Sequence, residues 1–446
     1  MRLLRRTSNV ALILAATNSY LLCCILPIAA GWKAIVVSLL IISFLYVNIR
    51  PSSKDCQNIR LRALSCGSEL LILFMLTSFL NFASAVFMFA MTAPKHINLS
   101  VFLINCVIAV ILEAIVFWNG IIRVYLTSVQ LGIKTRVIGI LLGWIPVANI
   151  IALIRIYKIT SRECVFETEK VHINEARCES RLCKTKYPLL LVHGVFFRDV
   201  KYLNYWGRIP GELEANGAKV FYGKQQSAAS IEKSAEELLL RIKNIVRDTG
   251  CGKVNVIAHS KGGLDSRYLI SCLGGDEYVA SLTTINTPHR GCIFAEYLLN
   301  KASDSFKTTL AAKYNRTMER LGDKDPDFIS AVTDLTCSRC EAINTIAKDK
   351  ETVFYQSVGS AARNARSGKF PLNVSYPLVR HFDGKNDGLV SVESARWGDN
   401  FTLISVPGKR GVTHADVIDL NRENIDGFDV REFYVELVAD LKEKGF

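Results

Sequence analysis

The stretch VNVIAHSKGG at positions 254–263 places Ser260 where an apolar run gives way to glycines. Its centre, Ala258-His259-Ser260-Lys261-Gly262, follows the pattern G-x-S-x-G, except that alanine replaces the first glycine. The run before the serine is predicted to be a strand and the residues after it a helix. A turn that presents a serine in this way needs small residues two positions before and after it. Ala258 and Gly262 are both small, so we predict that Ser260 is a nucleophile.

A serine nucleophile needs a base to take its proton and a carboxylate to orient that base. His414, in the loop-like GVTHADVIDL, is the only histidine that follows the last plausible acid. The acid is Asp383 or Asp387 in HFDGKNDGLVS, after the strand-like NVSYPLVRH. We favour Asp387 because it lies in a tight turn before an apolar pair, whereas Asp383 suits an Asp-Gly turn. His259 is not expected to be the base, since neighbouring strand residues point to opposite faces.

Two backbone N–H groups must stabilise the oxyanion that forms when serine attacks a carbonyl. One should belong to Lys261, the residue after the nucleophile. The other should come from the loop after an early strand, and LLLVHGVFFRD supplies such a loop. We predict the amide of Val195 as this second donor.

From Tyr187 onward, short β-rich runs alternate with helical ones. A fully apolar strand such as PLLLV suits a parallel sheet that is buried on both faces. Strands that alternate with helices predict βαβ units and an open α/β sheet. The predicted fold class of this half is therefore α/β, with a mostly parallel sheet and helices on both faces.

These motifs together resemble the bacterial true lipases of the α/β-hydrolase superfamily: LVHG at 191–194, AHSKGG at 258–263, TINTPHRG at 284–291, NDGLV at 386–390, and His414. The resemblance implies a catalytic triad of Ser260, Asp387 and His414, with the Val195 and Lys261 amides as the oxyanion hole. Some of these lipases also have alanine at the first glycine of the serine motif.

The same resemblance suggests a structural calcium site, because many of these lipases bind a calcium ion through an aspartate two residues after the catalytic histidine. Asp416 matches that position, but the position six after the histidine, often glutamine, is Leu420. We therefore expect no cofactor and do not adopt calcium. A lid is expected, where these lipases carry one, within residues 300–349; an ordinary cap helix is the alternative.

The first part of the chain differs from the second in charge and in apolar content. Residues 1–160 hold 14 Lys and Arg against three acids, whereas the remainder holds 40 against 38. Basic excess between apolar runs is a membrane topology signal. Five apolar runs predict four or five transmembrane helices; they are Val10–Ala30, Ala34–Val47, Leu70–Ala93, Val101–Trp118 and Val137–Ile154.

The predicted organisation is a transmembrane region at 1–158, a linker at 159–186 and a lipase-like α/β-hydrolase domain at 187–446. The loop charges alternate in a way that places the N-terminus in the cytoplasm. Five spans then put the hydrolase domain outside and four keep it inside; we slightly prefer outside. Glu113 lies within the fourth run, where a carboxyl marks either a polar contact between helices or a functional site.

The cysteines and the charge argue against other classes of site. Cys337 and Cys340 have the spacing of a metal or redox pair, but no second CxxC accompanies them, so we predict no metal site. The second half is nearly neutral and lacks interleaved basic and aromatic residues, so nucleic acid is not an expected partner.

The sequence as a whole predicts a multi-pass membrane protein of the cell membrane that hydrolyses acyl esters, with lipid or glyceride esters as substrates. Two alternatives stay open. One is an acyltransferase or a deacylase of a membrane glycoconjugate, which would use the same triad. The other is a non-catalytic membrane scaffold with a hydrolase-like domain.

Overall fold

The computed structural model describes residues 2–52, 58–92, 98–195 and 204–446. The chain divides into two compact units, Met1–Ile173 and Asn174–Phe446. The boundary falls inside the segment 159–186 that the sequence predicts as a linker. Most of that segment is helical, since helix α7 runs without interruption over Pro146–Arg177.

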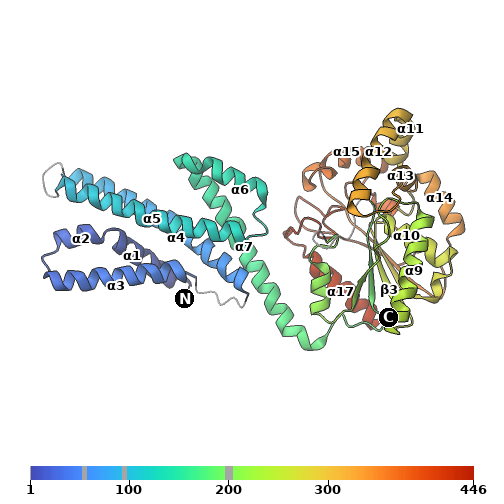
Figure 1. Cartoon of the computed structure of the whole chain (residues 1–446), viewed down its shortest axis with the longest axis horizontal. Helices are drawn as coiled ribbons and strands as arrows, with labels where there is room; N and C mark the ends of the chain where they lie inside the picture. The colour runs from blue at the N-terminus through green and yellow to red at the C-terminus, as the bar shows by residue number, and fades with distance from the viewer. Residues whose placement is uncertain (1, 53–57, 93–97, 196–203) are drawn as a thin grey trace. The chain divides into compact units, whose positions relative to one another are not determined.

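The first unit consists of helices that lie alongside one another (Figure 1). Their outward faces carry large apolar side chains, such as Phe79 and Val110, as a lipid-facing surface requires. The helices before α7 are α1 (Arg2–Thr17), α2 (Ser19–Ile25), α3 (Ala30–Ile49), α4 (Ile59–Thr92), α5 (Leu99–Thr127) and α6 (Gly132–Leu141).

Two glycines let α4 and α5 approach closely. A Cβ on Gly67 would lie 3.0 Å from the carbonyl oxygen of Gly120, and one on Gly120 would lie 3.3 Å from that of Gly67. Small residues at a helix interface are typical of membrane bundles. Glu113 of α5 accepts hydrogen bonds from Ser78 (3.1 Å) and Asn81 (2.9 Å) of α4, so it makes the polar interhelical contact.

In the described part of the chain, three helices are long and apolar enough to cross a membrane: α3, α4 and α5. The bent pair α1 and α2, with an angle of 62° between them, would make a fourth if it forms one broken span. The fifth apolar run, Val137–Ile154, does not form one helix. Helix α6 ends at Leu141, a 3-10 turn follows, and α7 begins at Pro146, a residue type that lacks the backbone N–H needed to continue a helix.

The second unit is built on a six-stranded parallel sheet with the order β2-β1-β3-β4-β5-β6. The strands are β1 (Leu189–Val192), β2 (Val220–Tyr222), β3 (Val254–His259), β4 (Val279–Ile285), β5 (Phe354–Gly359) and β6 (Phe401–Leu403). The chain moves from β1 to the edge strand β2 and then crosses to β3 on the other side of β1. Ligand sites of open α/β sheets lie at the carboxyl ends of strands beside such a reversal.

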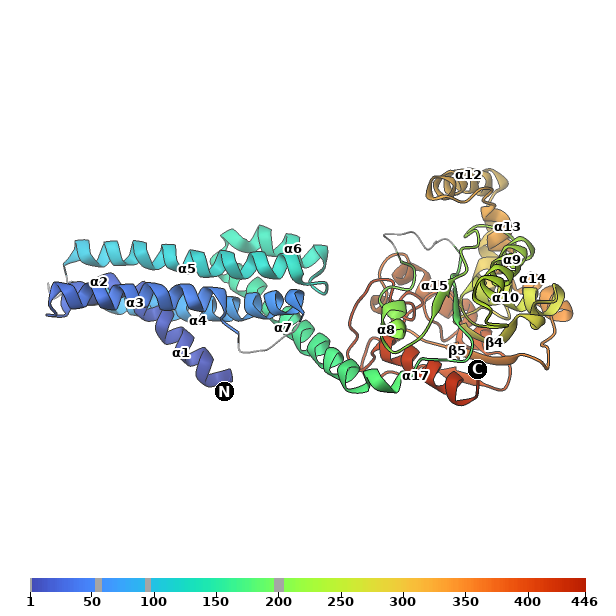
Figure 2. The same cartoon turned by 60° about the horizontal axis from the view of Figure 1, so that its bottom comes forward.

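Helices cover both faces of this sheet, and strand β1 is accordingly apolar on both sides. Leu189 and Leu191 of β1 pack with Tyr434 of α17 (Val430–Glu443), and α8 (Ile209–Ala215) joins them. The intervening Leu190 packs on the opposite face, against α9 (Ile231–Thr249) and α10 (Lys261–Cys272). Figure 2 shows α8 beside α17, with α9 and α10 across the sheet from them. This is the predicted α/β fold class.

The remaining helices of the second unit lie between β4 and β5 or between β5 and β6 in the chain. The first group is α11 (Ile293–Lys301), α12 (Asp304–Leu321), α13 (Phe328–Thr333) and α14 (Cys337–Ile346); the second is α15 (Leu372–Asp383) and α16 (Val392–Ala395). The expectation of a strand over NVSYPLVRH is wrong, because this segment belongs to α15. The buried residues of α15 are Leu372, Tyr376 and Val379, which are spaced four and three apart. That helical spacing outweighs the β-branched composition of the segment.

Candidate active site

Ser260 lies on the turn between β3 and α10 with a φ of 55° and a ψ of −131°. A positive φ at a non-glycine residue is strained and occurs mainly where the surrounding structure enforces it. Here the backbone N–H of Ser260 donates to the carbonyl of Ile285 at the end of β4 (3.0 Å). The strained serine is therefore anchored at the carboxyl edge of the sheet.

The close approach of strand and helix explains the glycines after the serine. A Cβ on Gly262 would lie 2.4 Å from the carbonyl oxygen of His193, and one on Gly263 would lie 2.1 Å from Oγ1 of Thr287. Gly194 is equally confined, since its Cβ would lie 2.7 Å from Cβ of Ser260. The loop after β1 thus passes directly against the serine.

Asp387 and His414 are hydrogen-bonded to each other. Nδ1 of His414 lies 2.7 Å from Oδ2 of Asp387, and both residues are buried. The other carboxylate oxygen, Oδ1, accepts the backbone N–H groups of Leu389 and Val390 at 2.8 Å each. The backbone N–H of His414 donates to the carbonyl of Asp387 (2.9 Å), so side chain and main chain hold the pair together.

The histidine of this pair lies beside the serine turn. The rings of His414 and His259 have centroids 4.4 Å apart, and His259 immediately precedes Ser260. Asp383, the alternative acid, has a different role: its two oxygens accept the N–H groups of Ile293 (3.0 Å) and Phe294 (3.2 Å) at the start of α11. The structure therefore brings His414 together with Asp387.

The two predicted oxyanion donors flank the serine. Lys261 is the first residue of α10, where a backbone N–H has no partner within the helix. Val195 follows Gly194, the residue packed against Ser260. Most of the loop after Val195, residues 196–203, lies outside the described part of the chain.

No sequence pattern predicts a role for Tyr205, which joins the two sides of this site. Its hydroxyl accepts the N–H of Gly194 (3.0 Å) and is hydrogen-bonded to Nδ1 of His259 (2.6 Å). Burial lowers the pKa of His259 well below its ordinary value, and the nearby His414 lowers it further. His259 is therefore a neutral, packed residue, as expected, and Tyr205 fixes its orientation.

Replacing Tyr205 with phenylalanine tests this bridge. The change leaves a buried N–H on Gly194 and the Nδ1 of His259 without the hydroxyl. Each unsatisfied group costs about 1–3 kcal/mol, so the free energy of unfolding should fall by at least about 1 kcal/mol. Chemical denaturation measures this, with Tyr297→Phe, at a half-exposed tyrosine of α11, as the control. Equal losses in the two variants would contradict the bridging role.

The residues at the position that suggested calcium do not fit that ion. Oδ2 of Asp416 accepts the N–H (2.9 Å) and hydroxyl (2.7 Å) of Thr413, and Oδ1 pairs with Arg410 (3.0 Å). The same Nη2 of Arg410 pairs with Glu423 (3.0 Å), so a guanidinium supplies the positive charge. Leu420 offers only an aliphatic side chain. Among the described residues, no group of three or more His, Cys, Asp or Glu side chains could hold a metal ion.

A chelator checks this reading of Asp416. The thermal unfolding midpoint should be the same, within error, before and after treatment with EDTA. The physical reason is that Arg410 already neutralises Asp416 and Glu423. A fall in the midpoint that calcium reverses would contradict it.

Cys337 and Cys340 have no feature of a reactive pair. Burial raises the pKa of Cys337 to about 11 and that of Cys340 to about 12, so both thiols stay protonated at neutral pH. The Sγ of Cys340 instead contacts the carbonyl oxygens of Pro288 (3.4 Å) and Asp334 (3.3 Å).

Sequence relatives of the chain are lipases. It is 34% identical over 172 residues to a triacylglycerol lipase of Pseudarthrobacter phenanthrenivorans, and the aligned segment covers 36% of this chain and 53% of the relative. It is also 34% identical over 172 residues to one of Burkholderia plantarii, covering 36% and 48%. Triacylglycerol lipase 2 of Saccharomyces cerevisiae is 29% identical over 271 residues, covering 56% and 78%. The chain thus spans about half the length of the two bacterial relatives.

No family model matches the chain. Among solved structures, a lipase of Bacillus licheniformis, BlEst2 in mature form, aligns with a TM-score of 0.43 at 21% identity, over 57% of this chain and 92% of that one. The metagenomic carboxyl esterase MGS0156 aligns with a TM-score of 0.45 at 15% identity, over 58% and 76%. The second unit thus combines a parallel α/β sheet and a strained serine after β3 with sequence similarity to triacylglycerol lipases.

Proposed function

We propose that this protein is a membrane-anchored serine hydrolase that cleaves acyl esters, with lipid or glyceride esters as its substrates. The observation that carries the proposal is the pairing of His414 with Asp387 (2.7 Å) beside the strained Ser260, on the sheet edge where such sites lie. The triacylglycerol lipases related to the chain support the ester as the bond that is cleaved.

In the proposed reaction each group takes one step. Oγ of Ser260 attacks the ester carbonyl while Nε2 of His414 takes its proton. Asp387 accepts from Nδ1 of His414, which fixes the tautomer and stabilises the imidazolium. The amides of Val195 and Lys261 stabilise the tetrahedral oxyanion. His414 then protonates the departing alcohol, and water, activated by the same histidine, releases the acid.

Two features favour a lipid substrate. The first is the set of apolar helices α3, α4 and α5, which would hold the enzyme at a membrane. The second is a group of exposed apolar side chains on α11, α12 and α15. Helix α12 lies within the expected lid, α15 ends just before the acid loop, and α11 contacts α15. These side chains are Ile293, Tyr297, Leu298, Phe306, Leu310, Val374 and Leu378. The expected lid, residues 300–349, contains α12, α13 and α14.

Labelling with a fluorophosphonate tests the nucleophile without any mutation. The probe phosphonylates an activated serine, so peptide mapping of the folded, labelled protein should find the adduct on Ser260. The same protein unfolded in denaturant serves as the control and should not react. An adduct on another residue, or none on the folded protein, would remove the proposed function.

The same chemistry reports the side of the membrane. An even number of spans keeps the hydrolase unit on the side of the N-terminus, and an odd number places it opposite. A membrane-impermeant fluorophosphonate labels Ser260 in intact cells only if the unit is outside. Permeabilised cells supply the control for total reactive protein.

A further inference from the structure

The side chain of Lys261 is buried beneath the serine turn. It is only 3% exposed, and its ammonium lies 2.7 Å from Oδ1 of Asp265, which is 4% exposed and one turn further along α10. Nζ also lies 3.4 Å from the hydroxyl of Ser234 on α9. The residue whose amide begins α10 is thus tied by its side chain both to its own helix and to the neighbouring one.

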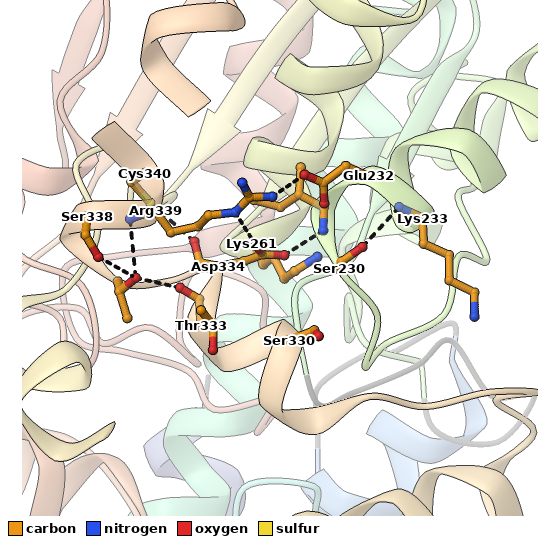
Figure 3. Close-up of polar contacts among 12 residues, drawn as sticks. Ser230, Glu232, Lys233, Lys261, Ser330, Thr333, Asp334, Ser338, Arg339 and Cys340 are labelled. Atoms are coloured by element: carbon orange, nitrogen blue, oxygen red, sulfur yellow. Dashed lines mark hydrogen bonds and ion pairs between the residues drawn. The ribbon is translucent and has the colours of Figure 1, made fainter. Parts of the chain in front are cut away.

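A second set of charges, drawn in Figure 3, lies on the segments around this pair. Asp334, just after α13, accepts the N–H of Ile231 at the start of α9 (2.6 Å) and pairs with Arg339 of α14 (3.0 Å). Arg339 also pairs with Glu232 of α9. The charges that act on Asp265 are Lys261 on its own helix, Glu232 on α9 and Asp334 just after α13, and Arg339 pairs with both of these acids.

Stability alone does not account for a buried pair of this kind. Removing two charges from water costs several kcal/mol per ion, and replacing buried ion pairs with apolar residues is often neutral or stabilising. What a fully satisfied buried pair does supply is a defined geometry. Here that geometry concerns the first turn of α10, which also presents the N–H of Lys261.

We infer that Asp265 is a positioning residue: by holding the ammonium of Lys261, it fixes the first turn of α10 and therefore the backbone N–H that stabilises the oxyanion. The inference rests on the proposed function, since it concerns a donor of the same site. An oxyanion donor acts only when it points to where the charge develops, so a small displacement lowers the rate without weakening substrate binding.

The positioning depends on the charge of Asp265. Burial raises the pKa of Asp265 to about 7, although Lys261 opposes the shift, while Asp334 and Glu232 add to it. Below this pH the carboxyl is protonated and holds the ammonium less firmly. The contribution to kcat is therefore present at higher pH and is lost as the pH falls through about 7.

The double variant Lys261→Met/Asp265→Leu removes both charges and keeps apolar bulk in their place. Its kcat for a soluble short-chain ester should be about tenfold lower, with KM within about twofold of the unsubstituted protein. Phosphonylation of Ser260 by the fluorophosphonate should slow by a similar factor. The control is Lys444→Met/Asp440→Leu, which removes an exposed pair of the same spacing at the C-terminal end of α17 and should leave both rates unchanged.

The pH profile separates positioning from a merely structural role. In the unsubstituted protein kcat should gain an extra step as the pH rises through about 7, and the double variant should lack it. A thermal midpoint like that of the unsubstituted protein would show that the variant folds.

Each outcome bears on a different claim. If the unsubstituted protein hydrolyses esters through Ser260 and the double variant matches it in kcat and in pH profile, the inference fails and the proposed function stands. A rise in KM at unchanged kcat would also overturn it, because the pair would then serve substrate binding. If the unsubstituted protein neither labels nor hydrolyses, the proposed function and the inference fall together.

Discussion

Ser260→Ala is expected to lower kcat for ester hydrolysis by about 10⁵- to 10⁶-fold, the loss that removal of a nucleophilic serine causes in other serine hydrolases. Without Oγ no acyl-enzyme can form, and His414 has no hydroxyl proton to take. The remaining rate should be that of water attacking an ester held by the oxyanion amides. A continuous assay with a chromogenic short-chain ester measures it.

The matched control for this variant is Ser271→Ala on the same helix. The hydroxyl of Ser271 donates to the carbonyl of Lys348 (2.6 Å), away from the His414–Asp387 pair, so its loss should change kcat by no more than about twofold. The Ser260 variant should still fold, because the backbone bonds that hold the turn do not involve Oγ. A folded Ser260→Ala protein that retains a tenth of the activity would be incompatible with a Ser260 nucleophile.

The serine turn was predictable because the forces that shape it are local. An apolar strand, one strained residue and a glycine two positions later are consecutive in the chain. The steric demand at Gly262 involves a carbonyl, that of His193, which belongs to an equally recognisable strand end. The parallel sheet followed from the same logic, since strands that are apolar on both faces can be buried only between two layers of helices.

The features that the sequence did not reveal depend on contacts between distant segments. Tyr205 and His259 are 54 positions apart, and nothing in the pattern near Tyr205 indicates that its hydroxyl spans the site. The Lys261–Asp265 pair has helical spacing, but an exposed pair of that spacing has the same sequence pattern. Its burial comes from the packing of α9 and of the segment after α13.

The last apolar run and α15 show the limit of composition. Val137–Ile154 has the apolar content of a span, yet the break between α6 and α7 divides it. NVSYPLVRH has the branched residues of a strand, yet its buried positions repeat with a helical period. In the first segment a break in the helix, and in the second the spacing of the buried residues, determines the structure against the composition. The choice between four and five spans depends on the first of these segments.

Asp387→Asn is expected to lower kcat by about 10⁴-fold with little change in KM. The amide can still accept from Leu389 and Val390 through its oxygen. Its NH₂ group would then face Nδ1 of His414, which would have to become an acceptor. That tautomer puts the proton on Nε2, where the base must be free to receive one from Ser260. The loss of activity thus comes from the wrong tautomer of His414 and not from unfolding. The thermal midpoint of the variant should therefore equal that of the unsubstituted protein.

Asp383→Asn is the matched comparison, because it makes the same change four residues earlier, at the alternative acid. Asp383 caps α11 through the N–H groups of Ile293 and Phe294, and an asparagine oxygen can accept one of them. We therefore expect a loss of up to about 1 kcal/mol in stability and only a small change in kcat. If instead the Asp383 variant lost activity by orders of magnitude and the Asp387 variant did not, the acid would be Asp383. A triad carboxylate acts by orienting its histidine, so removing it must lower kcat. If the Asp387 variant kept its kcat, the hydrogen bond between Asp387 and His414 would serve only to support the loop.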